Sequence, residues 1–274
     1  PLPLANAVPM IMGANIGTTV TATIVSLAHM GRREEFERAF PVAICHDIFN
    51  YLSVLVLLPI EIATGFLRRT ATLVASSLEG VGGFEYESPL RSLLDAGFAP
   101  ITAFAESVIT TAGGQAVFLI GMSGLLIFFA LYFLVRVMRK LVHTRVESIV
   151  NEVLGSSAVL AILVGIAMTV MVQSSSVTTS VLVPLAAAGL LRLEQAFPIT
   201  IGANIGTTVT ALLAALGVAG PNALAGLEIA LVHLLFNVSG TLLIYPIKAI
   251  RSVPLEAALA ITRIAVVSRK TTVL

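Results

Sequence analysis

Long apolar segments separated by short polar ones dominate the chain, and their lengths predict helices that cross a membrane. The apolar segments are residues 7–30, 40–67, 116–137, 159–191, 197–216 and 224–247. Because a helix rises 1.5 Å per residue, about 20 such residues cross a hydrocarbon layer of about 30 Å. The pattern therefore predicts an all-α integral membrane protein that crosses the bilayer several times.

One apolar segment has a polar centre. Within residues 159–191, one carboxamide and six hydroxyl side chains follow one another between Gln173 and Ser180. Lipid offers no hydrogen-bond partners, so polar groups at this depth must face protein or a water-filled cavity. Polar groups inside a membrane are typical of ion and solute pathways. We therefore expect this run to line a substrate site.

The chain contains an internal repeat. Residues 13–21, Gly-Ala-Asn-Ile-Gly-Thr-Thr-Val-Thr, recur unchanged as residues 202–210. Further along each copy comes the pattern His-x-x-Phe-Asn, which begins at His46 in the first copy and at His233 in the second. Identity over so many positions does not arise by chance, so we interpret the copies as structural repeats.

Basic residues predict opposite orientations for the two copies. Three arginines lie in residues 32–38, which we expect to be a loop, whereas residues 217–223 are uncharged; Lys248 and Arg251 follow the second copy. Basic loops stay in the cytoplasm, so the copies insert upside down relative to each other, although the arginines at 68–69 run against this rule. Inverted-topology repeats with broken helices are typical of secondary transporters, whose site lies at the repeat interface.

These features divide the chain into five parts. They are a first inverted repeat (1–67), an extramembrane loop (68–115), a linking transmembrane helix with a basic cytoplasmic segment (116–150), a second inverted repeat (151–252) and a C-terminal segment (253–274). Because the chain starts at Pro1 and not at methionine, we interpret it as an internal fragment whose first repeat lacks its N-terminal part.

Composition agrees with a membrane protein and excludes other classes. The 274 residues are 57% hydrophobic and 11% charged, whereas soluble domains have about 25% charged residues. A net charge of +1 offers no basic surface for nucleic acid, and the single cysteine, Cys45, permits no disulfide framework. The expected environment is a lipid bilayer.

The polar motifs contain hydroxyls and carboxamides but no lysine or arginine. Such groups, with the free N–H groups at the ends of broken helices, can bind an anion. They cannot offset a doubly negative oxyanion in a low dielectric, so Na⁺ ions held by side-chain oxygens would supply the remaining charge. An anion pore usually keeps Arg or Lys, so the motifs favour cation-coupled anion transport.

Several motif residues also have a structural interpretation. The Gly-x-x-x-Gly spacing in 13–21 and 202–210 serves tight helix packing, and Ser and Thr often bond a carbonyl of their own helix. We expect His46 and His233 to bond across helices. Asp47 has an apolar counterpart in the second copy, and it is a functional candidate because a charged group inside a membrane is rare.

With these motifs the chain resembles the type II sodium-dependent phosphate cotransporters. Members carry Gln-Ser-Ser-Ser and Gly-[Ala/Ser]-Asn-Ile-Gly-Thr in each of two inverted repeats. Here the second repeat has both, and the first has only the latter, at residues 13–18. Residues 68–115 match least: this loop is long and glycosylated in animal members, but here it is short and lacks Cys, which indicates a bacterial-type member.

The resemblance implies a carrier, not an enzyme, that couples Na⁺ to the uptake of inorganic phosphate without an organic cofactor. Its substrate would lie where two Gln-Ser-Ser-Ser re-entrant hairpins meet, and the first hairpin is expected upstream of Pro1, so the fragment alone should not transport. The residues implied for phosphate are Gln173, Ser174, Ser175, Ser176, Asn15 and Asn204. The residues implied for Na⁺ are Gln173, Ser175, Thr178, Thr179, Thr18, Thr19, Thr207, Thr208 and Asp47, the last matching an aspartate of the electrogenic members.

Other functions stay open at this point. A Na⁺-coupled carrier of another small anion, or a regulator of phosphate signalling, could use the same fold. A serine hydrolase would need a serine beside a histidine base. His46 and His233 instead occupy matching repeat positions, which argues against an enzyme.

Overall fold

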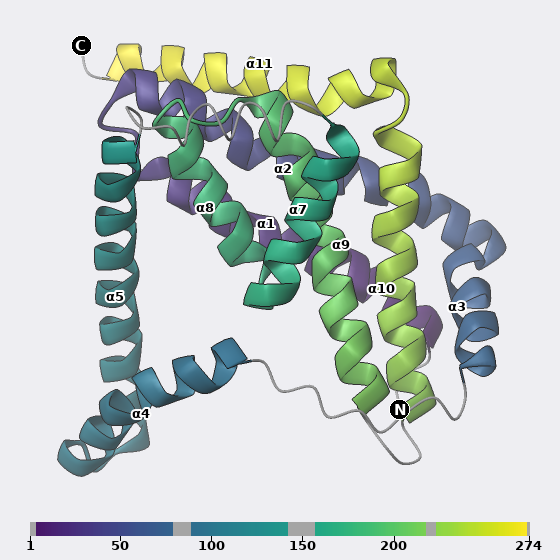
Figure 1. The fold of residues 1–274 in the computed structure, drawn as a ribbon, viewed down its shortest axis with the longest axis horizontal. Helices are drawn as coiled ribbons and strands as arrows, with labels where there is room; N and C mark the ends of the chain where they lie inside the picture. Colours follow the sequence, from purple (N-terminus) through teal and green to yellow (C-terminus); the bar gives the residue numbers. More distant parts are fainter. Residues whose placement is uncertain (1–3, 79–88, 142–156, 218–222, 273–274) are drawn as a thin grey trace. The chain divides into compact units, whose positions relative to one another are not determined.

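The computed structural model describes residues 4–78, 89–141, 157–217 and 223–272, and these form ten α-helices and no strand (Figure 1). The chain divides into two compact units, Pro1–Tyr86 with Arg145–Leu274, and Glu87–Thr144. The first unit contains α1 (Leu4–Leu27), α2 (Arg33–Thr64), α3 (Phe66–Ser77), α7 (Ala158–Val172), α8 (Ser175–Ala187), α9 (Leu193–Gly217), α10 (Ala223–Ile244) and α11 (Lys248–Thr272). The second unit contains α4 (Pro89–Val108) and α5 (Ala112–Leu141).

Five of these helices are long and apolar enough to cross a membrane: α1, α2, α9, α10 and the part of α5 from Ala112 to Ala130. The all-α membrane fold predicted from the sequence is therefore confirmed. The prediction of a loop at residues 32–38 is wrong, because α2 already begins at Arg33. Glu34 and Glu35 in its first turn favour a helix N-terminus, and Arg33 pairs with Glu37 one turn later at 2.7 Å.

The polar segment is a broken helix, as its composition predicts. With 15 residues in α7 and 13 in α8, each arm reaches only about 20 Å at 1.5 Å per residue, which is less than a hydrocarbon layer. The arms meet at Gln173, whose backbone is left-handed with φ 56°, and Ser174 then caps α8. The chain thus enters the helix bundle along α7, turns at Gln173 and Ser174, and leaves along α8, which is the geometry of a re-entrant hairpin (Figure 1).

Two long-range hydrogen bonds show that the repeats run in opposite directions. Near the start of α2, Arg38 Nε donates to the carbonyl of Ala187, just before α9 begins. Beyond the end of α2, Thr72 of α3 donates to Glu228 near the start of α10. Because α1 ends where α2 starts, α1 must end on the side where α9 begins. The pair α1–α2 is thus inverted relative to its sequence counterpart α9–α10.

Glycines allow α7 to lie against α9 at very close range. A Cβ at Gly202 would come within 2.1 Å of the Ile162 carbonyl oxygen, and a Cβ at Gly165 within 2.1 Å of the Ile199 carbonyl oxygen. Gly206 is also closed in, with Thr169 Cβ 2.7 Å from its Cβ position. The packing role expected of the Gly-x-x-x-Gly spacing is therefore confirmed in the second repeat.

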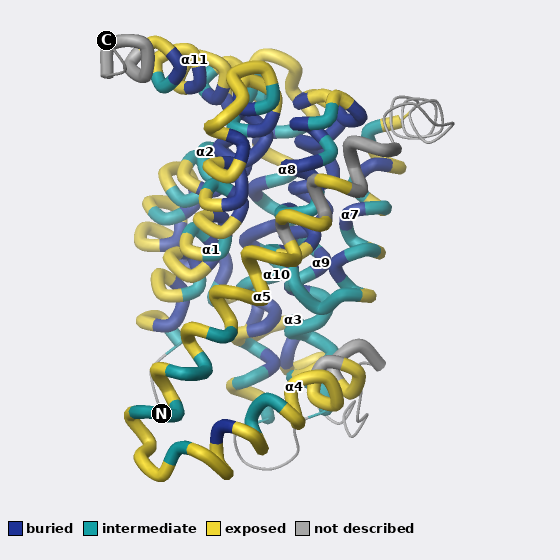
Figure 2. The backbone as a smooth tube through the Cα atoms, turned by 90° about the vertical axis from the view of Figure 1, so that its left-hand side faces the viewer, coloured by how far each residue is buried: buried dark blue, intermediate teal, exposed yellow. Residues whose placement is uncertain are grey.

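The same glycines in the first repeat face open space. A Cβ at Gly13 or Gly17 would meet no atom within 4 Å. They belong to an exposed stripe of α1, which is visible along that helix in Figure 2. The stripe consists of Met10, Gly13, Ala14, Gly17, Val20 and Ile24. Identical sequences thus have different surroundings, because α9 has α7 beside it and α1 has no equivalent helix within the described residues.

Two hydrophobic clusters hold the first unit together. One joins the first half of α2 to α8, α9 and α11 through residues such as Phe49, Phe197 and Ala258. The other joins α1, the end of α2, α3 and α10 through residues such as Met12 and Phe236. Each cluster thus takes residues from both repeats, so neither repeat has a core of its own.

Residues 68–115, expected as a loop, contain helices. Leu67 and Ala71 of α3 are fully buried in the cluster with α10. Glu61 is buried at the end of α2, where its carboxylate accepts the Leu67 N–H at 2.6 Å and so caps α3. Whether this part lies outside the membrane stays a prediction.

The second unit, α4–α5, packs Phe104 against Phe118 with ring centroids 5.9 Å apart. Most large apolar side chains of α5 are exposed, including Ile120 and Phe128, as suits a helix that faces lipid. Residues 79–88, residues 218–222 and the part of the basic segment beyond residue 141 lie outside the described residues.

The glycine asymmetry predicts opposite effects for the same substitution. Gly202→Ala should lower the melting temperature of the chain in detergent, because overpacking costs about 1–3 kcal/mol and each kcal/mol lowers Tm by about 2–4 °C at this size. Gly13→Ala should leave Tm unchanged or raise it, because alanine favours the helix by about 1 kcal/mol. Melting is followed by circular dichroism, since the chain has no Trp. Equal effects of the two substitutions would contradict the packing described above.

Candidate functional site

The tip of the hairpin presents helix ends within the bundle. Gln173 closes α7, with its N–H bonded to the carbonyl of Thr169 at 2.6 Å. Ser174 caps α8, and its hydroxyl accepts the Val177 N–H at 3.3 Å. The first N–H groups of any helix lack partners within it, as do the last carbonyls of the helix before. Free donors of α8 and free acceptors of α7 therefore meet at Gln173 and Ser174.

Thr178 and Thr179 of α8 each donate their hydroxyl hydrogen to a carbonyl of their own helix or its cap. Thr178 donates to the carbonyl of Ser174 and Thr179 to that of Ser175, at 3.1 and 2.9 Å. A second hydroxyl, that of Thr169 on α7, donates to Thr178 Oγ1 at 3.0 Å and ties the two arms together. A hydroxyl whose hydrogen is used in this way can only accept, so these oxygens suit a cation and not an anion.

The threonines of the repeated motif follow the same pattern. In α1, Thr18 donates to the Asn15 carbonyl and Thr19 to the Ile16 carbonyl, both at 2.8 Å. In α9, Thr207 and Thr208 donate to carbonyls three or four residues earlier. The bonding of a motif threonine to its own helix, expected for Thr210, is confirmed by its bond to the Thr207 carbonyl at 2.7 Å. The same bonding leaves the oxygens of the four threonines above as acceptors.

Near its tip, the hairpin is hydrogen-bonded to α1 of the first repeat. Ser176, at the start of α8, donates to the carbonyl of Thr18 at 3.2 Å. This contact brings Gln-Ser-Ser-Ser beside the first Gly-Ala-Asn-Ile-Gly-Thr motif, as the sequence predicts. The hairpin therefore touches both copies of that motif, since α7 packs closely on α9.

A buried network of carboxamides lies at the centre of the first unit. Asn15 donates to the side-chain oxygens of Asn50 and Asn237, at 3.1 and 3.0 Å, and Asn204 donates to Asn50 at 2.8 Å. All four asparagines are at most 4% exposed. They come from α1, α2, α9 and α10, so one cluster joins four helices of two repeats.

Two histidines complete the network in a crossed arrangement. His46 of the first repeat bonds the Asn204 oxygen at 2.7 Å, and His233 of the second bonds the Asn15 oxygen at 3.2 Å. Each histidine donates from Nε2, because the amide nitrogens of these asparagines already donate elsewhere. The interpretation of both histidines as structural, bonding across helices, is confirmed.

The network shows what sequence reasoning missed. Asn50 and Asn237 end the repeated His-x-x-Phe-Asn pattern, and the sequence alone predicts no function for them. In the structure their amides donate to the backbone carbonyls of Asn15 and Asn204. Recurrence of a buried polar residue in both repeats was the signal that could have identified them. Asn15 and Asn204, assigned to phosphate from the sequence, have their amide oxygens occupied by histidines in this conformation.

Asp47 lies apart from this network, on α2 facing α1. Its Oδ2 accepts the hydroxyl of Thr23 at 2.9 Å, while its Oδ1 is buried without a hydrogen-bond partner. The Ser180 hydroxyl of α8 is also buried and without a partner. A buried carboxylate oxygen without a partner is costly, so Asp47 keeps its place among the functional candidates, and its pairing with Na⁺ stays a prediction.

The network predicts a large loss of stability for one truncation. Asn50→Ala removes the acceptor of two buried amides and the donor to the Asn15 carbonyl, and each group left without a partner costs about 1–3 kcal/mol. Tm should fall by well over 5 °C. The control is Ser53→Ala, one turn along α2, whose hydroxyl bonds only the Phe49 carbonyl and should matter little. A small effect of Asn50→Ala would show that the network contributes no stability.

Comparison with known proteins places the chain in one family. The family model described as Na+/Pi-cotransporter matches residues 126–265, half of the chain. Sodium-dependent phosphate transport protein 2A of Rattus norvegicus is 34% identical over 325 residues, which cover 95% of this chain and 51% of that protein. The 2B protein of Bos taurus is 33% identical over 334 residues, covering 91% and 48%.

The match to these relatives is extensive but partial. The chain spans about half the length of the curated relatives it matches. The alignment to the rat protein is longer than this chain, so that relative carries residues that are missing here. No solved structure shows a significant match. The matched family model and the identity over nearly the whole chain show that it belongs to the Na+/Pi-cotransporter family.

Proposed function

We propose that this chain forms the larger part of the substrate site in a secondary transporter that couples Na⁺ influx to the uptake of inorganic phosphate across the cell (inner) membrane. The observation that carries the proposal is the hairpin tip, where an α-helix ends and another begins inside the bundle at Gln173 and Ser174. Such discontinuous helices form the substrate and ion sites of secondary transporters.

Phosphate fits the start of α8. The N–H groups of the first turn carry a partial positive charge, which favours an anion without a basic side chain. Ser174, Ser175 and Ser176 begin this turn, and Gln173 directly precedes it in the chain. The Gln173 amide and the Ser174 and Ser175 hydroxyls would donate to the phosphate oxygens. Ser176, whose hydroxyl donates to the Thr18 carbonyl in this conformation, would join them when that bond exchanges.

Na⁺ fits the acceptors around the same tip. The free carbonyls at the end of α7 attract a cation, as half-helix C-termini do in other carriers. The hydroxyl oxygens of Thr178 and Thr179, and of Thr18 and Thr19 on α1, have donated their hydrogens and present lone pairs. Thr207 and Thr208, Ser175 and the Gln173 oxygen extend this set of oxygens. Bound Na⁺ would offset the charge of phosphate in a site that has no Lys or Arg in its motifs.

The open stripe on α1 supports a second hairpin. In the second repeat, the Gly202 and Gly206 face is closed by α7, whereas the matching Gly13 and Gly17 face is bare. A hairpin built like α7–α8 and placed before residue 1 by the repeat would cover that face. Its tip would then meet the tip at Gln173 and complete the phosphate site, so we expect a second Gln-Ser-Ser-like run about 17 residues upstream of Pro1.

The carboxamide network can exist in two arrangements, one for each position of the repeats during transport. Carriers with inverted repeats move one repeat against the other around the bound substrate. Here the bonds that cross between repeats include those of His46 to Asn204 and His233 to Asn15. The family resemblance implies that Asn15 and Asn204 contact phosphate. They would do so only when their bonds to the histidines break and the substrate takes the place of the histidines.

Substitution of Gln173 tests the site. In the protein that carries this chain with its upstream part, Gln173→Ala should abolish Na⁺-dependent uptake of radiolabelled phosphate while membrane insertion stays normal. A carboxamide can offer oxygen to Na⁺ and N–H to phosphate at once, and alanine offers neither. Gln115→Ala is the matched control, because Gln115 only bonds the Ile109 carbonyl in the other unit. Normal phosphate uptake by a well-expressed Gln173→Ala protein would rule out the assignment of Gln173. Uptake of sulfate in place of phosphate by the unsubstituted protein would rule out phosphate as the substrate.

Substitution of Asp47 tests the charge balance. Asp47→Asn keeps an acceptor for Thr23 but removes the charge, so uptake should persist with lower Na⁺ cooperativity while phosphate-evoked current disappears. The lost charge is worth about 2.3 kcal/mol per 100 mV, or about fiftyfold in the attainable gradient. Thr23→Val, which keeps the carboxylate, should retain the current. Normal current per phosphate in Asp47→Asn would show that Asp47 does not set the number of charges moved.

A further inference from the structure

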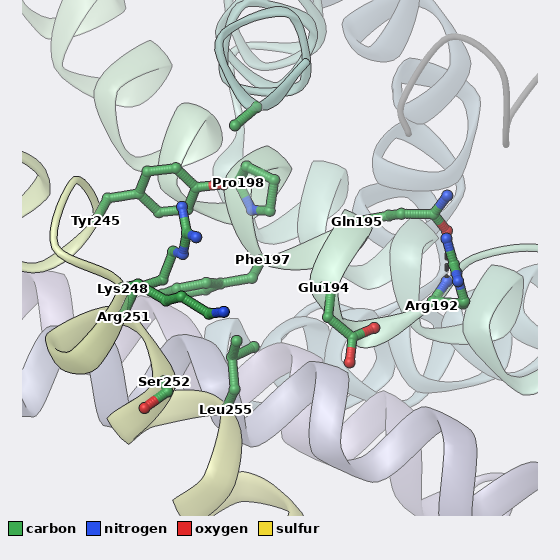
Figure 3. A pocket seen from close by; sticks show the side chains of 11 residues that line it. Arg192, Glu194, Gln195, Phe197, Pro198, Tyr245, Lys248, Arg251, Ser252 and Leu255 are labelled. Carbon is green, nitrogen blue, oxygen red and sulfur yellow. Dashed lines mark hydrogen bonds between the residues drawn. The ribbon is translucent and has the colours of Figure 1, made fainter. Parts of the chain in front are cut away.

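A pocket that contains several charged residues lies away from the hairpin tip, where α9 and α11 begin and α10 ends. It encloses about 420 Å³, within the range of small-ligand pockets, and the close-up in Figure 3 shows its lining. Its charged residues are Arg192, Glu194, Lys248 and Arg251. Three basic side chains and one carboxylate thus line the pocket. The proposed transport mechanism assigns no role to it.

The pocket holds one guanidinium in a fixed position. Arg251 lies over the ring of Tyr245, with its central carbon 5.0 Å from the ring centroid. Tyr245 in turn packs on Phe197, whose ring centroid lies 5.8 Å away. Figure 3 shows Lys248 beside this stack, with Glu194 and Arg192 on the opposite side. Because cation–π contact and half-burial restrict Arg251, its N–H groups are set in place before a ligand binds.

Within the part of the chain that the structure describes, the cations of the pocket have no carboxylate partner. Among the residues that the structure describes, the ion pairs involve only His29, Arg32, Arg33 and the glutamates next to them. Lys248 and Arg251 are therefore more than 4.0 Å from any described carboxylate oxygen. They are available to an anion, although Glu194 of the same pocket lowers the local positive charge.

Helix ends add to this charge. α11 begins at Lys248 and α9 at Leu193, so two helix N-termini lie at one pocket. Each N-terminus contributes about half a positive elementary charge through its free N–H groups. Together with the arginine and lysine side chains, this is the donor set that binds a phosphate group.

The direction of α11 places the pocket at a membrane surface. In Figure 1, α11 runs across the ends of α9 and α10 and not along them. One side of α11, with Pro254, Ala258 and Thr262 four residues apart, is buried against the rest of the unit. Ile264 and Val267 are 69% and 61% exposed. A helix that runs across the ends of the membrane spans and exposes apolar residues is expected in the interface, at the level of the lipid headgroups.

We propose that the pocket formed by Tyr245, Lys248, Arg251 and Arg192 binds the phosphate group of an anionic ligand, at a site separate from the transport path. Arg251 and Lys248 hold the phosphate oxygens, and the N-terminus of α11 adds N–H donors. Two sources share this chemistry, a phospholipid headgroup from the adjoining leaflet and inorganic phosphate from the aqueous side. The position of α11 brings lipid headgroups to the pocket, and the experiment separates the two sources.

The first arm measures lipid binding. The protein is purified in detergent, mixed with phosphatidylglycerol or phosphatidylcholine, and its lipid adducts are counted by native mass spectrometry. Arg251→Gln and Lys248→Gln should each weaken phosphatidylglycerol binding about fivefold, as expected for one basic residue near a membrane surface. Arg263→Gln is the matched control, because Arg263 is exposed on the same helix outside the pocket. Glu194→Gln should act in the opposite direction and strengthen binding.

The second arm uses inorganic phosphate as the probe, in a Gln173→Ala background that removes the proposed transport site. Binding that survives Gln173→Ala and is lost in Arg251→Gln assigns the pocket to free phosphate; lipid binding with the same dependence on Arg251 assigns it to a headgroup. Equal effects of Arg251→Gln and Arg263→Gln would overturn the proposal, because they would show only general attraction to the basic helix. So would unchanged binding of both probes in Arg251→Gln. Neither result would touch the transport proposal, which depends on Gln173.

Discussion

The structure depends on one buried hydrogen-bond cluster that neither repeat can form alone. Asn15, Asn50, Asn204 and Asn237 lie near the middle of α1, α2, α9 and α10, where lipid would offer no partner and a lone carboxamide would be costly. Their amides bond one another and the backbone, and the two histidines cross between repeats. Because each group left without a partner carries a large penalty, the cluster fixes how the repeats meet and which faces remain for the hairpin.

That arrangement explains how a site without basic side chains in its motifs can handle an anion. The hairpin lies against α9 through glycines and touches α1 through the bond from Ser176 to Thr18. Its tip therefore brings the end of one helix and the start of another to the repeat interface, with hydroxyl oxygens around them. Helix N-termini attract anions and C-termini attract cations, so in the proposed site one break in the backbone would serve both kinds of ligand.

The two ends of the bundle serve different purposes. At the start of α9 and α11, Arg251 is held on Tyr245 in an open pocket beside a helix that lies across the spans. At the opposite end, Glu61 folds back to cap α3, and Thr72 bonds Glu228, so polar groups there satisfy one another. Among the described residues, Lys248 and Arg251 have no carboxylate partner and are open to an anion, whereas Glu61 and Glu228 at the opposite end are already hydrogen-bonded.

The sequence by itself determined the class, the repeats and the residues of the hairpin, because hydropathy, identity between copies and polarity inside an apolar run are local properties of the chain. It also indicated that His46 and His233 bond across helices. It did not determine that residues 32–38 are helical, that Glu61 is a cap, or that Asn50 and Asn237 join the repeats, because each depends on partners far away in the chain. Identical motifs at Gly13 and Gly202 make the limit plain: one is bare and the other closed by α7. Only the tertiary structure decides this, because the environment of a helix face is set by the helix packed against it and not by the face's own sequence.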